Sequence, residues 1–562
     1  MLYSNNFKTT LILSGFLLTP MAFGQQTDPK QPVIRVDTRL VEVDVVVRDA
    51  KGPVKGLTKE DFTVLDNGKP QRISSFSIKE GRASTKLRPM AAGAVSNRIN
   101  SLGEEPASVT VVLWDTLNTD LDDQGWVRAQ ITKYLAQLKP DDRVALYKLG
   151  KSVSVMQDFS DDPAALVKAL PKMNLGAPFN LSNDDISPNV IVDLSGGASA
   201  DQAAAIAEVN AMAQNEYLET AWYSLRDRVW VTTRALQAIA QHLGGLPGRK
   251  KLIWVSAGFP IVSMTTGQRN NTTQIETLDL SNFVQKAIQV LNHANVAVYP
   301  IDARGLSSKD TGGNLAGNQL SGTPQIGLNA TGIDTMNFVA SGTGGHAFYA
   351  GNDIAGSVRE VLQDAEVTYS LAFTPSNPQP KADKNGVVPE DDSYHSLSVK
   401  VARKGLDLRY RKGYMATDVI AASDSQRKAQ LNADMQAALD STGIGLTAVN
   451  TPDKSTPSLY HLDLNIDIHD LHFQQRDDSA GNPRWLASID FATMLANTQK
   501  PIGTQEEISI NLTEPRLREA LTNGLIVSRP LAYEGPASKV RILIQDRATG
   551  KAGSVSVAVG PK

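Results

Sequence analysis

The chain has 562 residues, which is enough for about three or four folding units. Its 56 basic and 59 acidic residues leave a net charge of −3, too balanced to supply the positive field that binding to nucleic acid or to an anionic membrane requires. The absence of cysteine excludes disulfide scaffolds, thiolate metal sites and cysteine nucleophiles.

Residues 1–24 have the pattern of a secretory signal peptide. Lys8 precedes an apolar run at residues 9–23, and Ala22-Phe23-Gly24 has the small-x-small pattern of a cleavage site. A membrane anchor is the alternative, but the run is shorter than the ~20 residues that span a bilayer. We therefore expect an exported protein, periplasmic or extracellular, with no transmembrane segment after the signal is cleaved.

Residues 33–80 alternate in the way that is typical of antiparallel strands. Valine at every second position from Val41 to Val47 puts apolar side chains on one face and mostly polar ones on the other. Three strands in so short a segment cannot bury both faces alone, so we expect a partner sheet. Residues 80–105 show no period and are predicted to be a linker.

Residues 107–366 are predicted to form a doubly wound α/β domain. The apolar run that ends at Asp115 is typical of a strand buried on both faces of a parallel sheet. Strands and helices then alternate, which implies a mostly parallel sheet with helices on both faces. Residues 171–199 are predicted to be a surface insertion, and residues 305–332 a second long loop. The further strands are expected at 143–150, 153–157, 251–256, 296–302 and 346–350, and the longest helix at 200–243.

The pattern predicts three more strands in residues 367–415. Together with residues 33–80 they would make one six-stranded sandwich into which the α/β domain is inserted, whereas two separate small sheets are the alternative. A helical linker is expected at residues 423–440 and an all-β sandwich at residues 455–562. In that sandwich, unbroken alternation from His461 to His469 predicts one half-buried strand.

Six short motifs follow one another along the chain, at residues 113–119, 246–251, 254–260, 298–305, 343–345 and 411–414. The first is Leu-Trp-Asp-Thr-Leu-Asn-Thr and the third is Trp-Val-Ser-Ala-Gly-Phe-Pro. In this order they resemble the von Willebrand factor A-related domain family of exported bacterial proteins, of the acidobacterial type, over about residues 34–415. The family has no settled activity, so the resemblance implies a von Willebrand A-like binding module rather than a reaction.

The resemblance also implies a metal-ion-dependent adhesion site in degenerate form. Von Willebrand A domains commonly hold Mg²⁺ where the strands end, with oxygen donors from a D-x-S-x-S loop, a distant Thr and an Asp. Asp115 and Thr119 keep the first and last places of that loop, but Leu117 and Ala257 stand where a hydroxyl and a carboxylate should be. If Mg²⁺, or alternatively Mn²⁺ or Ca²⁺, binds, its expected ligands are Asp115, Thr119 and Asp302.

The sequence also allows an alternative in which this site holds no ion. In it, Asp115 caps the turn that follows its strand and Thr119 bonds to the backbone, as such residues usually do at a strand end. Losing two oxygen donors would weaken an ion site by about 10²- to 10⁴-fold. The sequence therefore leaves a bound metal as the less favoured alternative.

No motif for catalysis is present. The sequence contains neither a G-x-S-x-G elbow nor an H-E-x-x-H pair, so no catalytic residue is predicted. His461 and His469 share the polar face of the predicted C-terminal strand with two aspartates, and a Zn²⁺ site there is an alternative to a solvated face. At the rise of a strand the two imidazoles lie roughly 26 Å apart, which favours the solvated face.

We therefore expect an exported, non-enzymatic binding or adhesion protein. Its ligand is a protein or another macromolecule, held at Asp115, Asn118, Thr119 and Ser256. A structural cell-envelope protein without a discrete ligand site is the alternative, and a hydrolase is the third. The sequence leaves open the identity of the ligand, the presence of a metal and the oligomeric state.

Overall fold

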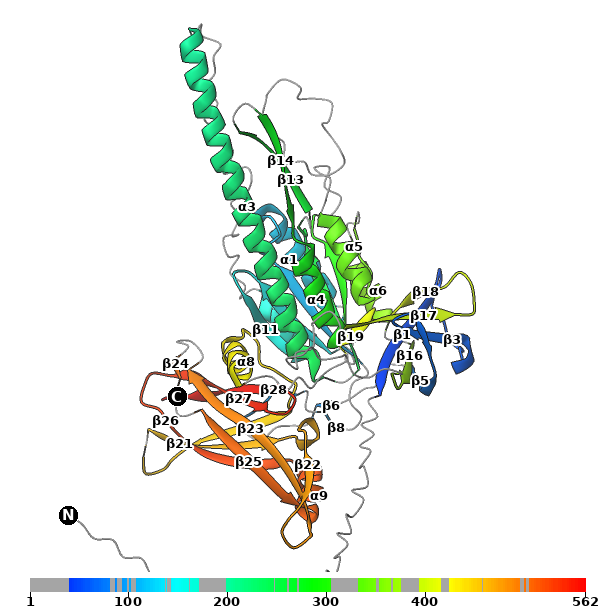
Figure 1. Cartoon of the computed structure of the whole chain (residues 1–562), viewed down its shortest axis with the longest axis vertical. Helices are drawn as coiled ribbons and strands as arrows, with labels where there is room; N and C mark the ends of the chain where they lie inside the picture. Colours follow the sequence, from blue (N-terminus) through cyan, green and yellow to red (C-terminus); the bar gives the residue numbers. More distant parts are fainter. Residues whose placement is uncertain are drawn as a thin grey trace, which may run out of the picture. The chain divides into compact units, whose positions relative to one another are not determined.

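The computed structural model describes residues 40–80 and most of residues 86–561 (Figure 1). The longest internal ranges outside the described residues are 171–198, 305–331 and 376–393. The signal peptide predicted at residues 1–24 and almost all of the two predicted long loops lie outside the described residues. Within the described ranges, no helix is both long enough and apolar enough to cross a bilayer.

A five-stranded sheet forms the centre of the α/β segment, with its strands in the order β11, β10, β9, β12, β15. Four strands run parallel, and β11 at the edge is antiparallel to β10, as the short link between them predicts. The strand order reverses between β9 and β12, and such a reversal is where α/β sheets bind ligands. The strands are β9 (Ser108–Asp115), β10 (Val144–Leu149), β11 (Val153–Ser160), β12 (Arg249–Ser256) and β15 (Val296–Asp302).

Helices cover both faces of this sheet. On β9, Val111 and Leu113 join one apolar cluster with α3, α4 and α5, whereas Val112 and Trp114 join another with α1, α2 and α6. The apolar run of β9 is nearly continuous because alternate side chains are buried on opposite sides. The helices are α1 (Leu121–Leu135), α2 (Pro163–Ala169), α3 (Ala200–Gly244), α4 (Ser281–His293), α5 (Gly332–Thr343) and α6 (Ile354–Gln363).

The predicted strand at residues 346–350 is wrong. Of its described residues, 346–349, only Phe348 pairs with the sheet, through a single parallel bridge to Ile301 of β15. Gly344, just before this segment, has a φ of 75°, and a Cβ there would lie 1.9 Å from the carbonyl oxygen of Tyr410. The backbone turns sharply at this glycine, and in the segment that follows Phe348 alone exchanges backbone hydrogen bonds with Pro300 and Asp302 of β15 among the residues described. A hairpin that the sequence did not predict follows β12, formed by β13 (Val262–Arg269) and β14 (Thr272–Asp279).

Strands from before and after the α/β segment share two sheets (Figure 1). In one sheet β16 pairs with both β1 and β5, and in the other β17 pairs with β3. Val43, Val64, Tyr369 and Leu397 from the four contributing stretches belong to one apolar core. The elements are β1 (Val41–Asp49), β2 (Gly52–Pro53), η1 (Lys59–Asp61), β3 (Phe62–Asp66), β4 (Lys69–Gln71), β5 (Ile73–Glu80), β16 (Val367–Phe373), β17 (Tyr394–Val401), β18 (Asp407–Arg409) and β19 (Gly413–Met415).

The C-terminal part consists of two sheets with a common apolar core, after helix α8. One sheet has the order β26, β21, β20, β7, and the other is built on β22, β23, β27 and β28 with β24 and β25 beside β23. The elements are α8 (Asp424–Gln436), β20 (Leu446–Pro452), β21 (Leu459–Ile466), η3 (Ile468–Asp470), β22 (Gln474–Asp477), β23 (Pro483–Leu495), β24 (Lys500–Pro501), β25 (Glu506–Thr513), α9 (Glu514–Asn523), β26 (Leu525–Ala532), β27 (Ser538–Asp546) and β28 (Ala552–Val559).

The linker predicted at residues 80–105 contains strands instead. β7 (Ala94–Ser96) pairs with β20 of the C-terminal part, and β6 (Lys86–Leu87) pairs with β8 (Ser101–Leu102). These strands have two or three residues each, too few to show a period in the sequence. Their pairing partners therefore decide their conformation.

The predicted strand through His469 ends earlier, at Ile466. Asp467 accepts a hydrogen bond from the backbone of His469 and so begins the short 3-10 helix η3. His469 Nδ1 lies 2.8 Å from Asp467, whereas His461 Nε2 lies 2.8 Å from Asp453. The two imidazoles thus have separate carboxylate partners, which agrees with a solvated face rather than a shared ion.

Asp434 of α8 makes the stability of the C-terminal part depend on pH. Burial raises the pKa of Asp434 to about 6, although a hydrogen bond from Gln430 and the charge of Arg541 oppose the rise. The unfolded chain loses this proton near pH ~4. Between about pH 4 and pH 6 the folded state therefore binds more protons than the unfolded state, and stability falls as the pH rises through this window.

Asp434→Asn is expected to raise the free energy of unfolding by roughly 2–3 kcal/mol at pH 7.5 and by almost nothing at pH 4. The asparagine keeps an acceptor for Gln430 but has no proton to lose. Urea unfolding at the two pH values measures the difference. Asp477→Asn, at an exposed position of β22, is the matched control and should change stability by less than about 0.5 kcal/mol. An equal gain at both pH values would contradict the prediction.

Candidate functional site

Asp115 and Ser256 end neighbouring strands at the point where the strand order reverses. Trp114 is in register with Val255, so Asp115 and Ser256 follow side by side at the carboxyl ends of β9 and β12. Ser256 is also in register with Asp302 at the end of β15. Three polar residues thus end three adjacent parallel strands, where a ligand crevice forms in α/β sheets.

The carboxylate of Asp115 is enclosed by protein donors. Oδ1 accepts hydrogen bonds from the backbone N–H groups of Leu117 and Asn118, both at 3.0 Å. Oδ2 accepts hydrogen bonds from Asn118 Nδ2 at 2.8 Å, Ser256 Oγ at 2.8 Å and Trp254 Nε1 at 3.0 Å. A carboxylate offers about four lone-pair positions, so these donors leave none for a metal ion.

Burial and hydrogen bonding act on the pKa of Asp115 in opposite directions. Burial raises the pKa, whereas the hydrogen bonds from Asn118, Ser256 and Trp254 lower it, and the net effect is a rise. The donors therefore offset only part of the cost of burying this charge. The ionised carboxylate depends on them because each favours the charged form.

Arg228 of α3 places a positive charge near this cluster. Burial lowers the pKa of Arg228, and the negative charges of Asp115 and Asp120 partly reverse that fall. A guanidinium keeps its proton in proteins because it is the most basic of the side chains. A cation of the protein itself therefore lies close to the carboxylate that the resemblance assigns to a metal ion.

Asn118 connects the cluster to α3, because its Nδ2 also donates to Thr232 Oγ1 at 2.8 Å. Leu117, which precedes it, is buried in the apolar core. Asn118 Oδ1 and Thr119 Oγ1 are buried and have no hydrogen-bond partner among the residues that the structure describes. Buried side-chain oxygens without a hydrogen-bond partner are uncommon in proteins.

Asp302 does not join Asp115. Its Oδ1 accepts hydrogen bonds from the backbone N and Nε of Arg304, at 3.0 and 2.9 Å, and its Oδ2 accepts one from Nη2 of the same residue at 3.0 Å. This bidentate pair engages both oxygens. Across the described ranges, no group of three or more carboxylate and imidazole side chains is placed to hold a metal ion. Asp115 and Asp302 therefore have separate hydrogen-bond partners, although both were expected beside Thr119 as ligands of one ion.

The expected ligand-binding residues are buried. Asp115, Thr119 and Ser256 have no exposed surface, and Asn118 exposes 5 %. The start of α5 lies against the loop after β12: a Cβ on Gly258 would meet the backbone of Gly332 at 2.6 Å. The four residues are therefore enclosed by the protein and do not form part of an open surface.

Sequence reasoning missed Trp254 and Arg228. Trp254 stands two residues before Ser256 on the same strand, so the period of a strand already indicates that both side chains leave the same face. The sequence therefore contains a signal that places Trp254 beside Ser256. No local pattern indicates Arg228, because it reaches the cluster from a helix that is distant in sequence.

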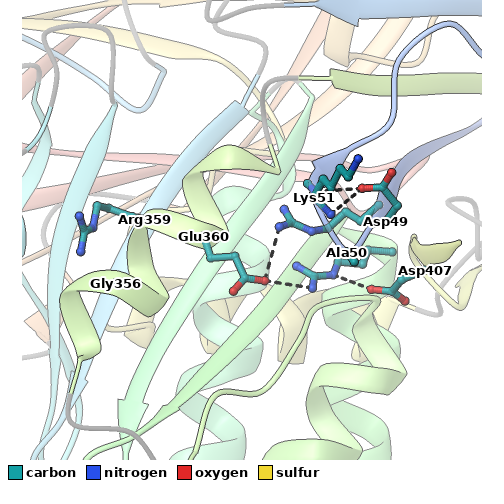
Figure 2. Close-up of a pocket in the computed structure, with 10 residues that line it drawn as sticks. Asp49, Ala50, Lys51, Gly356, Arg359, Glu360 and Asp407 are labelled. Atoms are coloured by element: carbon teal, nitrogen blue, oxygen red, sulfur yellow. Dashed lines mark hydrogen bonds and ion pairs between the residues drawn. The ribbon is translucent and has the colours of Figure 1, made fainter.

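A second polar site lies between α6, β1 and β18, where charged residues line a cavity of about 490 Å³ (Figure 2). Two arginines of its lining share a buried acceptor: the carboxylate of Asp364 accepts a hydrogen bond from Arg48 Nη1 at 2.5 Å and one from Arg409 Nη1 at 2.8 Å. Glu360 lies 3.6 Å and 3.4 Å from the same two guanidinium groups (Figure 2). The cavity lining is Arg48, Asp49, Ala50, Lys51, Gly52, Gly356, Arg359, Glu360, Asp407 and Arg409.

These contacts join the α/β segment to the two sheets that residues 41–80 and 367–415 share. Burial alone would raise the pKa of Asp364, but the charges of Arg409, Arg48 and Lys251 lower it below its usual value. The guanidinium groups that line the cavity are thus paired within the protein, and a ligand would compete with these ion pairs. Arg48 and Asp364 are 316 positions apart, so the sequence contains no signal for the pair.

No family model matches the sequence, and no curated protein matches it. Among solved structures, an aerotolerance-related membrane protein from Bacteroides fragilis is similar at 10% identity and a TM-score of 0.24, over 46% of this chain and 98% of that chain. Proximal thread matrix protein 1 from the mussel byssus is similar at 8% identity and a TM-score of 0.23, over 48% of each chain. Three domains of the type V pili tip protein Mfa5 from Porphyromonas gingivalis are similar at 7% identity and a TM-score of 0.25, over 86% of this chain and 77% of that chain. Scores this low identify no ligand for the present chain.

Proposed function

We propose that this chain is an exported, non-enzymatic binding protein whose doubly wound, von Willebrand A-like domain works without a metal ion. The observation that carries the proposal is the carboxylate of Asp115, which accepts five hydrogen bonds from the protein. An adhesion site of the metal-dependent type needs a free carboxylate oxygen and a hydroxyl where Leu117 stands. The residues present therefore do not fit a divalent ion.

The Asp115 cluster has a positioning role in this proposal. Its hydrogen bonds fix the turn after β9, the end of β12 and, through Asn118, the side of α3. Loops that carry recognition surfaces depend on a rigid scaffold beneath them. The ligand, a protein or another macromolecule, would bind around this edge while Asp115, Asn118 and Ser256 hold its surroundings in place.

Divalent ions are expected to have no effect on the folded chain. Titration with Mg²⁺, Mn²⁺ or Ca²⁺ in a calorimeter should give no saturable heat up to millimolar concentration, and EDTA should leave the thermal midpoint unchanged. The reason is the absence of a free oxygen on Asp115, together with the pairing of Asp302 to Arg304. Saturable binding that Asp115→Ala removes would contradict the proposal, and Asp302→Asn would then show whether β15 takes part.

Binding is tested by passing a periplasmic or secreted extract over the immobilised chain. Saturable retention of one component that falls with Asn118→Ala would support it, because that change frees the turn after β9 from α3. The matched control is Thr119→Val, which removes a hydroxyl without a hydrogen-bond partner in the described structure. The second candidate is a structural envelope protein, because the Asp115 cluster is buried and offers no open site for a ligand. If no component of the extract is retained saturably, this second candidate is favoured.

A further inference from the structure

The exposed side of α3 carries an apolar stripe. Val209, Met212, Tyr223 and Trp230 expose 53%, 62%, 58% and 48% of their surface. At about 100° per residue they fall within about 60° of one another around the helix, along roughly 32 Å of its length. Exposed apolar residues are usually scattered singly, so an aligned set of this size indicates a contact surface.

The stripe lies away from the face that α3 packs against the sheet. Leu225, Val229, Leu236 and Leu243 define the packed face, about 150° from the stripe. Before Leu225, none of the α3 side chains that the structure describes is buried. Packing therefore does not account for the first half of the helix.

Local sequence explains why this half is helical. Ser199 and Gln202 form a capping box at its start, and alanine, the best helix former, recurs through residues 200–213. A helix with this composition can present side chains without support from the core. In Figure 1 this half forms the upper turns of α3, which extend beyond the central sheet.

The residue types on the stripe are those of protein interfaces. The guanidinium carbon of Arg226 lies 5.1 Å from the ring centroid of Tyr223, and that of Arg234 lies 4.9 Å from the ring centroid of Trp230. Tryptophan, tyrosine, methionine and arginine are enriched where proteins meet. The two cation–π contacts also hold the aromatic rings in place, which lowers the entropy lost on binding.

The charges along α3 indicate what covers the stripe. Residues 201–219 contain four carboxylates and no lysine or arginine, whereas residues 220–235 contain Arg226 and Arg234 beside the stripe, Arg228 at the Asp115 cluster, and one aspartate. Two copies of the helix side by side in opposite directions would place the acidic half of each against the basic half of the other. Parallel copies would place like charges together, which is destabilising.

We infer that α3 is a dimerisation element through which two copies of this chain pair in antiparallel orientation. A two-fold axis near residue 218 brings Val209 close to the partner subunit's Trp230 and Met212 close to the partner subunit's Tyr223. Such an interface is isologous, so it closes at two copies and forms no filament. The inference is independent of the proposed function.

Sedimentation equilibrium of the full chain tests the pairing. The chain is expected to be dimeric at micromolar concentration, and Trp230→Asp is expected to raise the dissociation constant at least about tenfold. Ile526→Asp is the matched control, because among the described residues outside α3 Ile526 is the most exposed large apolar one, at 68%. It should leave the dimer intact. A chain that stays monomeric at 100 μM, or a dimer that Trp230→Asp leaves unchanged while circular dichroism shows both proteins folded, would overturn the inference.

The absence of cysteine allows the orientation to be measured separately. Glu219→Cys places one thiol near the proposed axis, and Arg234→Cys places one far from it. On oxidation, antiparallel helices link two copies through the first variant and not through the second. Linking of both variants to the same extent would show a parallel pair, and linking of neither would show that α3 does not meet its copy; each result would overturn the inference.

Discussion

Asp115→Ala is expected to lower the free energy of unfolding by about 3–5 kcal/mol, to the same extent with and without Mg²⁺. The change removes the acceptor of five hydrogen bonds and leaves buried donors on Asn118, Trp254 and Ser256 without it. Each buried donor that loses its partner costs about 1–3 kcal/mol, and relaxation recovers part of the sum. Urea unfolding followed by tryptophan fluorescence measures the loss, because Trp254 belongs to the cluster.

Two single changes separate the positioning role of the cluster from metal binding. Ser256→Ala removes one donor of several and should cost about 1–2 kcal/mol. Thr119→Val keeps the shape of a side chain whose hydroxyl has no partner in the described structure, and should change stability by less than about 0.5 kcal/mol. In a metal site the hydroxyls of both Ser256 and Thr119 would contribute to ion binding, so both changes would lower stability in the presence of the ion. A loss with Thr119→Val that appears only in the presence of Mg²⁺ would therefore contradict our interpretation.

Asp364→Asn is expected to destabilise the chain by about 3–5 kcal/mol, because it leaves the guanidinium groups of Arg48 and Arg409 buried without their main carboxylate. It also weakens the acceptor of Tyr299, whose hydroxyl donates to Asp364 at 3.0 Å. The lowered pKa of Asp364 means that this stabilisation is complete above about pH 4 and is lost as the pH falls through the lowered value. Urea unfolding at pH 7 and at progressively lower pH follows the loss.

Glu360→Gln is the matched control for this network. Glu360 contacts the same two guanidinium groups, but 38% of its side chain is exposed to solvent. Pairs with an exposed partner contribute about 0–1 kcal/mol because water screens them. A loss from Glu360→Gln as large as that from Asp364→Asn would show that the half-exposed Glu360 joins the two parts as much as the buried Asp364 does.

Local patterns predicted the elements whose burial is regular. The strand that ends at Asp115 was predicted from its continuous apolar run, and the helix at residues 200–243 from a helical pattern whose apolar spacing is regular only in its second half. The carboxyl-edge rule for parallel strands also predicts Asp115 and Ser256 at one edge of the sheet, where Ser256 Oγ donates a hydrogen bond to Asp115. Periodicity and topology together therefore suffice to bring these two residues to one place.

What surrounds those residues depends on contacts between distant segments. Arg228 approaches Asp115 from a helix that follows a long stretch of intervening chain, and Arg48 meets Asp364 across most of the α/β segment. The strand β7 has no pattern of its own and exists because β20 offers it an edge. Such features follow from tertiary pairing, and a single sequence carries no local trace of them.

The course of the chain through β7 has a consequence for dissecting the protein into fragments. Asn97, directly after β7, accepts a hydrogen bond from Leu446 N and donates to the carbonyl oxygens of Ser441 and Ile444. A C-terminal fragment cut at the apparent boundary near residue 440 would leave one border of β20 without its neighbour and these backbone groups open to water or to another molecule. The natural unit for producing the C-terminal part alone is thus a discontinuous one, which includes a short piece from far upstream.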